Sequence, residues 1–476
     1  MSVSRRADRV SGTGRRRASN PARVVVTGGI IGGALLLAGS VIASSVATRT
    51  VRRAQISEVA SAATPVLSAR RAPATLSLIT RTGRVERALS AVSSMVPTGS
   101  CAVVKWKGET MVDRGADAPV IPASSIKIIT GTAALAVLGR DFRFETSVQG
   151  TVDGLGNVGD LYLVGGGDPV LLRGEYPATQ KYPTNGGTRL EVLADAVRDA
   201  GVRAVTGAII GVDTRYDAER WIPSWSPSLR GIEGGPLGAL MVNDGAVVGE
   251  KSKRDDPALA AAVEFGNLLV ARGITTSGIA RHDVLPSGTS KIASAQSAPL
   301  AEIVRDMLIN SDNNTAELLL KEMGLVKKGA GTTQNGIAVV TEFLQSKGAA
   351  SGVTMVDGSG LSSANRVPCS VLMSLLDQQK DFLPTSLAVA GVSGTLRAAF
   401  EGQSVRGRLV GKTGTLTGVK ALVGYVPVEG DEPVEFALLL NAPGIDEQIR
   451  HRPIWYAFGA AMGKARGAPT ADQLAP

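Results

Sequence analysis

The longest uninterrupted apolar stretch lies near the N-terminus of the 476-residue chain, where residues 24–48 carry no charged side chain. As a helix rising ~1.5 Å per residue, this segment is long enough to cross a ~30 Å hydrocarbon layer. Residues 1–23 are polar and rich in arginine, which predicts a disordered cytoplasmic arm and an extracytoplasmic body. The pattern favours a retained single-pass anchor. The small residues up to Ala47 also resemble a signal-peptide cleavage site, which would give a secreted protein.

Helix-like and strand-like patterns follow one another beyond the apolar stretch. Residues 49–85 show no clear periodicity and are interpreted as a stalk. The next apolar positions predict a helix over 85–96 and an antiparallel hairpin over 101–120. An amphipathic helix is predicted over 121–139, opened by Pro122.

The middle of the chain differs from its two flanks. Between residues 145 and 293 short strands are interrupted by glycine, as in LYLVGGGD and AVTGAIIGVD, which predicts a separate, mainly β inserted domain with some helix. The flanks, 86–144 and 294–466, combine helices with adjacent antiparallel strands. We therefore expect an α/β sandwich built from two discontinuous halves, followed by a short tail at 467–476.

Charge and composition exclude several classes of function. The net charge is +9, but residues 1–90 alone carry a net of +12, so the rest of the chain has a net of −3. With no basic stripe in the body and only 4% aromatic residues, nucleic-acid binding is not expected. The two histidines, His282 and His451, stand alone, so neither a metal site nor a Ser-His-Asp triad is predicted, and no cofactor is implied. Cys101 and Cys369 can form one disulfide bond or remain two buried thiols.

A serine and a lysine at helical spacing supply the first candidate chemistry. Ser124 and Lys127 form the only S-x-x-K in the chain. Residues i and i+3 of a helix lie on one face, so the amine can reach the hydroxyl as a base. The start of a helix also presents backbone N–H groups to a developing oxyanion.

Two further motifs follow in order along the chain. Ser311-Asp312-Asn313 interrupts a long helical stretch, and Lys412-Thr413-Gly414 lies in a strand-like run. A cation and a hydroxyl at the second motif suit a substrate carboxylate, and glycine lets the backbone approach closely. The combination of S-x-x-K, S-D-N and K-T-G is typical of penicillin-binding proteins and class A β-lactamases.

The chain resembles the class C low-molecular-mass penicillin-binding proteins, which form the S13 family of D-alanyl-D-alanine carboxypeptidases and endopeptidases. The resemblance spans roughly residues 90–465 and is carried by PASSIK, FRFETSV, GDLYLVGGGDP, LMVNDG, SAPLAEIV, DGSGLSSANRVP, GVSGTLR and GKTGTLTGVKALVGY. It implies a transpeptidase-like sandwich of an antiparallel sheet with helices, and one or two domains inserted between the first two motifs. Peptidoglycan stem peptides ending in D-Ala-D-Ala are the implied substrates, and β-lactams the implied covalent inhibitors.

The same resemblance implies a role for each motif residue. Ser124 would be acylated, Lys127 would take its proton, and Ser311 and Asn313 would serve proton transfer and orientation. Lys412 and Thr413 would bind the terminal carboxylate, with Gly414 and Thr415 beside them in the substrate-binding site. The backbone N–H groups of Ser124 and Thr415 would form the oxyanion hole.

One part of the family pattern is absent. Members that bind the free amino-acid head of a diaminopimelate side chain share an acidic residue in a Trp-rich stretch of the insert and an arginine after DGSGLS. Here Ser228 and Ser363 occupy the corresponding positions. This puts recognition of that side chain in doubt, with Glu233 as a replacement acid if the insert folds back.

Two other functions compete with a carboxypeptidase. A β-lactamase needs a deacylating carboxylate, and no E-x-x-x-N occurs between Lys127 and Ser311. A non-catalytic wall-binding protein has no use for a complete set of reactive residues. Both alternatives are therefore less consistent with the sequence.

Overall fold

The computed structural model describes residues 73–181 and 187–467. The predicted arm at 1–23, the apolar segment at 24–48 and all but the first residue of the predicted tail lie outside these ranges. Within them, no helix is both long and apolar enough to cross a membrane.

A six-stranded antiparallel sheet forms the centre of the body, with the strand order β13-β14-β15-β16-β1-β2. Strands β1 and β2 come from the N-terminal half of the body, and the other four come from the C-terminal half. The strands are β1 (Cys101–Trp106), β2 (Glu109–Arg114), β13 (Ala388–Val389), β14 (Val410–Leu416), β15 (Val419–Val428) and β16 (Asp431–Asn441). The predicted hairpin at 101–120 and the predicted pairing of the C-terminal strands are both confirmed.

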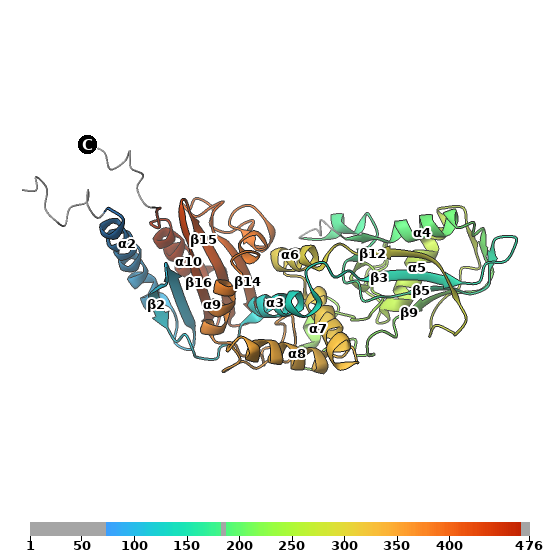
Figure 1. The fold of residues 1–476 in the computed structure, drawn as a ribbon, viewed down its shortest axis with the longest axis horizontal. Coiled ribbons are helices and arrows are strands. Elements are labelled where there is room, and N and C mark those ends of the chain that lie inside the picture. The colour runs from blue at the N-terminus through green and yellow to red at the C-terminus, as the bar shows by residue number, and fades with distance from the viewer. Residues whose placement is uncertain (1–72, 182–186, 468–476) are drawn as a thin grey trace, which may run out of the picture. The chain divides into compact units, whose positions relative to one another are not determined.

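Helices cover both faces of this sheet (Figure 1). One face packs against α2 (Pro73–Met95) and α10 (Gln448–Met462), and the other against α3 (Lys127–Leu138) and α9 (Cys369–Gln378). Three more helices, α6 (Leu300–Asn310), α7 (Asn313–Lys328) and α8 (Thr333–Ser346), extend the second layer around α3. Because side chains alternate along a strand, Phe436 and Leu438 of β16 enter the first core, whereas Ala437 and Leu439 enter the second. This is the sandwich expected from the two discontinuous halves.

The predicted stalk is wrong at its C-terminal end, because α2 begins at Pro73 rather than after residue 85. Val85, a residue of α2, is fully buried in the core that this helix shares with the sheet. Arg81 pairs with Asp431 at 2.6 Å and lies over the ring of Trp106. The sequence misled because the part of α2 before Val85 is anchored through Arg81 rather than through a run of apolar residues.

The inserted region contains helices as well as strands. Its five-stranded sheet has the order β11-β9-β5-β3-β12, with β5, β9 and β11 parallel, and a smaller parallel sheet has the order β10-β8-β4. Its elements are β3 (Glu145–Gly150), β4 (Asn157–Val158), β5 (Leu161–Val164), β6 (Leu171–Leu172), β7 (Thr188–Arg189), α4 (Leu190–Asp199), β8 (Ala204–Val205), β9 (Ile209–Val212), α5 (Pro257–Val270), β10 (Thr275–Thr276), β11 (Ala280–His282) and β12 (Ser290–Gln296). Since β12 pairs with β3 as far as Gln296, the insert ends about three residues later than the sequence predicts.

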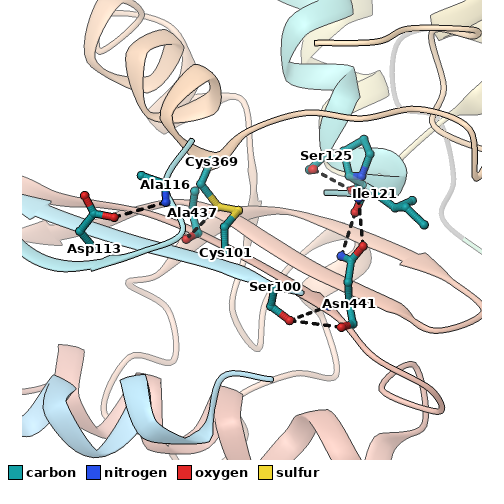
Figure 2. The surroundings of a disulfide bond; sticks show 10 residues. Ser100, Cys101, Asp113, Ala116, Ile121, Ser125, Cys369, Ala437 and Asn441 are labelled. Carbon is teal, nitrogen blue, oxygen red and sulfur yellow. Dashed lines mark hydrogen bonds between the residues drawn. A yellow bond between two sulfur atoms is a disulfide. The ribbon is translucent and has the colours of Figure 1, made fainter. Parts of the chain in front are cut away.

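A disulfide bond joins Cys101 at the start of β1 to Cys369 at the start of α9 (Figure 2). The two cysteines are 268 residues apart in sequence, and both are completely buried. Of the two states that the sequence left open, the structure therefore shows the bridge. Its position ties the central sheet to the helical layer that carries α3.

Removing this bridge should lower stability markedly, because it shortens a very long loop in the unfolded chain. For the double variant Cys101→Ala/Cys369→Ala we expect a free energy of unfolding about 2–5 kcal/mol lower than that of the parent. Thermal unfolding of both proteins, each with and without reductant, measures this. Reductant should lower the melting temperature of the parent alone. Equal melting temperatures for oxidised parent and variant would show that the bridge adds nothing.

Candidate active site

Ser124 lies in a single turn of 3-10 helix, Ala123–Ile126, that leads directly into α3. Ala123 before it adopts a left-handed backbone with φ of 46°, which is uncommon for a residue with a side chain. A Cβ atom at Gly360 would come within 2.1 Å of the Ala123 carbonyl oxygen, so only glycine fits there. The serine is thus presented on a strained turn that packs against the loop Asp357-Gly358-Ser359-Gly360, called the DGSG loop below.

Asn441 holds the segment that leads into this turn (Figure 2). Its side-chain oxygen accepts the N–H of Ile121 at 2.9 Å, and its side-chain nitrogen donates to the Ile121 carbonyl at 3.1 Å. Ser100 bonds the backbone of Asn441 in turn. The end of β16 therefore fixes the chain three residues before Ser124.

Lys127 points its amine at Ser124 from within the core. Its Nζ lies 2.9 Å from Ser124 Oγ, 2.7 Å from Asn313 Oδ1 and 2.5 Å from the Ser359 carbonyl oxygen. The side chain has no exposed surface. Burial lowers the pKa of Lys127 to about 8, and the charge of nearby carboxylates, Asp357 foremost, opposes part of that shift. An amine with this pKa is neutral in about a tenth of molecules at pH 7.

Two buried carboxylates shape the loop behind Lys127. Glu317 accepts the N–H groups of Gly358 and Ser359, at 3.1 and 2.8 Å, so it orients the very carbonyl that contacts the lysine. Burial, followed by the charge of Asp357, raises the pKa of Glu317 to about 7. Asp357 accepts from Gly360 N, at 2.9 Å, and from three further donors, Trp225 Nε1, Ser362 N and Asn365 Nδ2. These bonds give the DGSG loop a fixed shape.

The S-D-N motif occupies the junction between α6 and α7. Ser311 ends α6 in a left-handed conformation with φ of 66°, and Asp312 caps α7 by accepting the N–H of Thr315. Asn313 then bridges two parts of the protein. Its Oδ1 accepts from Lys127, and its Nδ2 donates to the carbonyl of Glu233 in the insert at 2.7 Å.

The K-T-G motif lies on β14, next to the turn that holds Ser124. Lys412 Nζ donates to Ser311 Oγ at 2.8 Å and to the Thr413 carbonyl at 2.8 Å. Burial first, and the Lys127 ammonium second, lower the pKa of Lys412 well below its usual value. A Cβ atom at Gly414 would lie 2.9 Å from the Pro122 carbonyl oxygen, so glycine allows β14 and the serine turn to approach closely.

A cleft of about 710 Å³ opens over these groups. The predicted site residues that line it are Ser124, Ser311, Asn313, Thr413 and Thr415, and its other walls come from Gln180, Lys181, Ile232, Glu233, Asn310, Leu361, Thr395, Ala398, Ala399, Lys420, Asp446, Gln448, His451, Arg452, Trp455 and Tyr456. Lys127 and Lys412 lie beneath the surface. With Gly414 on β14, the structure thus brings together all eight site residues predicted from the sequence. Two residues of the site, Glu317 and Lys420, were not predicted by the sequence analysis.

The positions considered for side-chain recognition separate into two groups. Glu233 reaches the cleft because its insert loop folds back onto Asn313, whereas Ser228 and Ser363 are exposed and do not line the cleft. A signal for Glu317 was present in the sequence, since it stands four residues after Asn313 and therefore on the same face of the helix.

Comparison with known proteins places the chain in a family. The family model of the D-Ala-D-Ala carboxypeptidase 3 (S13) family matches residues 98–254 and 241–454. A D-alanyl-D-alanine carboxypeptidase from an Actinomadura species is 30% identical in an alignment of 417 residues that covers 69% of this chain and 75% of that protein. Carboxypeptidase DacB of Mycolicibacterium smegmatis is 32% identical in an alignment of 359 residues that covers 71% of this chain and 75% of that protein. The chain belongs to the S13 family of D-Ala-D-Ala carboxypeptidases.

Solved structures agree on the fold. Penicillin binding protein 4 of Haemophilus influenzae covers 78% of this chain and 97% of its own, with a TM-score of 0.65 and 20% identity. A predatory endopeptidase of Bdellovibrio bacteriovorus, solved with an immunity protein, covers 79% and 95%, with a TM-score of 0.54 and 18% identity. The predicted transpeptidase-like fold is confirmed.

Proposed function

We propose that this protein is a serine D-Ala-D-Ala carboxypeptidase that forms an acyl-enzyme at Ser124. The observation that carries the proposal is the 2.9 Å contact between Ser124 Oγ and a buried lysine amine at the floor of an open cleft. Membership of the S13 family supplies the substrate class, peptides that end in D-Ala-D-Ala. Release of free D-alanine from such a peptide by the full-length protein tests the proposal.

Acylation begins with the removal of a proton from Ser124. The neutral amine of Lys127 takes the proton as Ser124 Oγ attacks the carbonyl carbon between the two D-alanines. The backbone N–H groups of Ser124 and Thr415 stabilise the oxyanion that forms. The S-D-N asparagine, Asn313, keeps the lysine amine in place through its Oδ1.

The second half of the step expels the terminal residue. Ser311, which accepts from Lys412 and lines the cleft, can relay the proton that Lys127 has taken up: its hydroxyl gives a proton to the leaving amine and receives one in return. Thr413 offers its hydroxyl to the terminal carboxylate from β14, and Gly414 leaves room for the substrate backbone. Water then hydrolyses the ester and regenerates Ser124. A β-lactam that acylates Ser124 would inhibit the enzyme by the same first step.

The open cleft leaves room for a leaving group larger than one D-alanine. Glu233, Lys181 and residues of α10 line it in addition to the motif residues. We therefore extend the proposal to D,D-endopeptidase action on cross-linked peptides, in which a second stem takes the place of the terminal residue.

Because the proposed substrate is a peptide of peptidoglycan, we expect the enzyme to act outside the cytoplasm. We propose that residues 1–23 form a cytoplasmic arm, that 24–48 form a single membrane span and that residues from about 49 connect it to the body. Within the body, 73–144 and 297–466 would make the catalytic domain, with 145–296 as the insert. Protease protection of full-length protein in sealed vesicles tests the topology.

The pKa of Lys127 predicts how the rate depends on pH. Because only the neutral amine accepts a proton, kcat/KM for D-Ala release should rise about tenfold between pH 6 and pH 7 and level off near the pKa of about 8. Glu233→Gln removes one of the negative charges that raise this pKa, so its profile should move to lower pH. A flat profile between pH 6 and pH 8 in the parent would contradict the role of Lys127 as base.

A further inference from the structure

A lysine outside the three motifs reaches the active-site cleft from the strand beside K-T-G. Lys420 on β15 stands directly opposite Thr415 on β14 in the antiparallel ladder. Its Nζ donates to Thr415 Oγ1 at 2.9 Å and lies 5.2 Å from the centre of the Trp455 ring. Lys420, Thr415 and Trp455 all line the cleft. The ammonium group of Lys420 thus contacts both β14 and the indole ring of Trp455.

The charges around Lys420 leave this end of the cleft positive. Asp446 on the loop before α10 is the one acid among the groups that perturb it, and Arg452 of α10 and Lys181 of the insert oppose that acid. His451 of α10 also faces Lys420. Neither Lys420 nor Arg452 forms an ion pair with any residue in the described ranges.

The lysine of the motif is placed differently. Lys412 has no exposed surface, and both of its hydrogen bonds go to groups of the protein, Ser311 Oγ and the Thr413 carbonyl. Burial and the neighbouring Lys127 ammonium lower its pKa well below the usual value. A carboxylate in the cleft can therefore contact Thr413 and Thr415, but Lys412 can act on it only through Ser311.

We infer that Lys420 is the cation that binds the terminal carboxylate of the substrate, together with the hydroxyl groups of Thr413 and Thr415. This inference rests on the proposed function and names a specificity-determining residue for it. The chemical class recognised is a leaving residue with a free α-carboxylate, whether it is a terminal D-alanine or the D-centre of a cross-link. A leaving residue whose carboxylate is amidated is selected against.

Lys420 can bind the substrate carboxylate only over a limited range of pH. Burial first lowers its pKa to about 8, Asp446 opposes the shift, and Arg452 and Lys181 add to it. Below that value the ammonium form is available to the carboxylate. Above it the charge is lost, so the affinity for a carboxylate substrate should fall as the pH rises past about 8.

The test separates carboxylate binding from a structural effect by pairing two enzymes with two substrates. Parent and Lys420→Met, both full-length, are assayed with a blocked peptide ending in D-Ala-D-Ala and with the same peptide ending in D-Ala-D-Ala-amide. Loss of a charge-assisted hydrogen bond to a carboxylate weakens binding by roughly 10- to 100-fold. We expect Lys420→Met to lower kcat/KM for the free acid by that factor, mainly through KM, and to leave the amide nearly unchanged.

Two further variants complete the experiment. Lys420→Arg keeps the positive charge, so it should restore most of kcat/KM for the free acid and extend activity to higher pH. Lys347→Met, which removes an exposed lysine from the end of α8, should match the parent with both substrates.

The outcomes distinguish a failure of the role of Lys420 from a failure of the proposed carboxypeptidase function. Equal losses for acid and amide in Lys420→Met, or no loss for either, would overturn the role of Lys420 while the parent still releases D-alanine. A parent that releases no D-alanine from the free acid would instead contradict the proposed function itself.

Discussion

Ser124→Ala should reduce D-alanine release to background. Removing the nucleophile of a serine peptidase typically lowers kcat by on the order of 10⁶, because the hydroxyl, its base and the oxyanion hole act as one unit. The fold should survive, since Ser124 is partly exposed at the cleft and, among the residues that the structure describes, its hydroxyl is bonded by Lys127 alone. Chromatographic detection of D-alanine, together with a thermal unfolding curve, measures both effects.

The matched control for this variant is Ser363→Ala. Ser363 is exposed, lies outside the cleft and follows the DGSG loop closely in sequence. It should release D-alanine at the parental rate. Activity retained in Ser124→Ala would mean that another nucleophile carries the reaction.

Lys127→Met should slow acylation by about 10²–10⁴-fold, the usual contribution of a general base. Methionine nearly fills the space of the lysine chain, and burying a charge is unfavourable, so the melting temperature should stay close to that of the parent. The loss should therefore appear in the second-order rate constant for labelling by a fluorescent penicillin and not in the fold.

A second buried lysine provides the control. Lys321 on α7 is fully buried like Lys127, but it pairs with Asp217 instead of contacting Ser124. Lys321→Met leaves that carboxylate unpaired, so it should unfold at lower temperature yet be acylated at a rate near that of the parent. The opposite pattern, an unstable Lys127→Met that still acylates, would make Lys127 a structural residue.

Much of the fold follows from local patterns in the sequence. The hairpin at β1 and β2, the helix after Pro122 and the C-terminal strands are all predicted by apolar periodicity. The start of α2 is not, because Arg81 is held by an ion pair and an aromatic ring that come from β16 and β1. Contacts between segments so far apart leave no local signal.

The active site, like the fold, contains residues placed by local spacing and residues placed by long-range contacts. Residues within one motif, such as Ser124 and Lys127, are brought together by helical spacing alone. Their supports come from elsewhere: Asn441 holds the approach to the serine turn, and Glu317 shapes the DGSG loop. Lys420 could be placed opposite Thr415 only once the register of β14 and β15 was known. Periodicity identifies elements, but register and burial decide which charges face the substrate.

The most direct test of acyl-enzyme formation at Ser124 is to map a penicillin adduct on the intact protein. The full-length parent is incubated with benzylpenicillin, quenched, digested and analysed by tandem mass spectrometry. The account predicts one added penicillin per protein, on Ser124 in the peptide that contains the turn Ala123–Ile126. Absence of an adduct, or an adduct on any other residue, would contradict it.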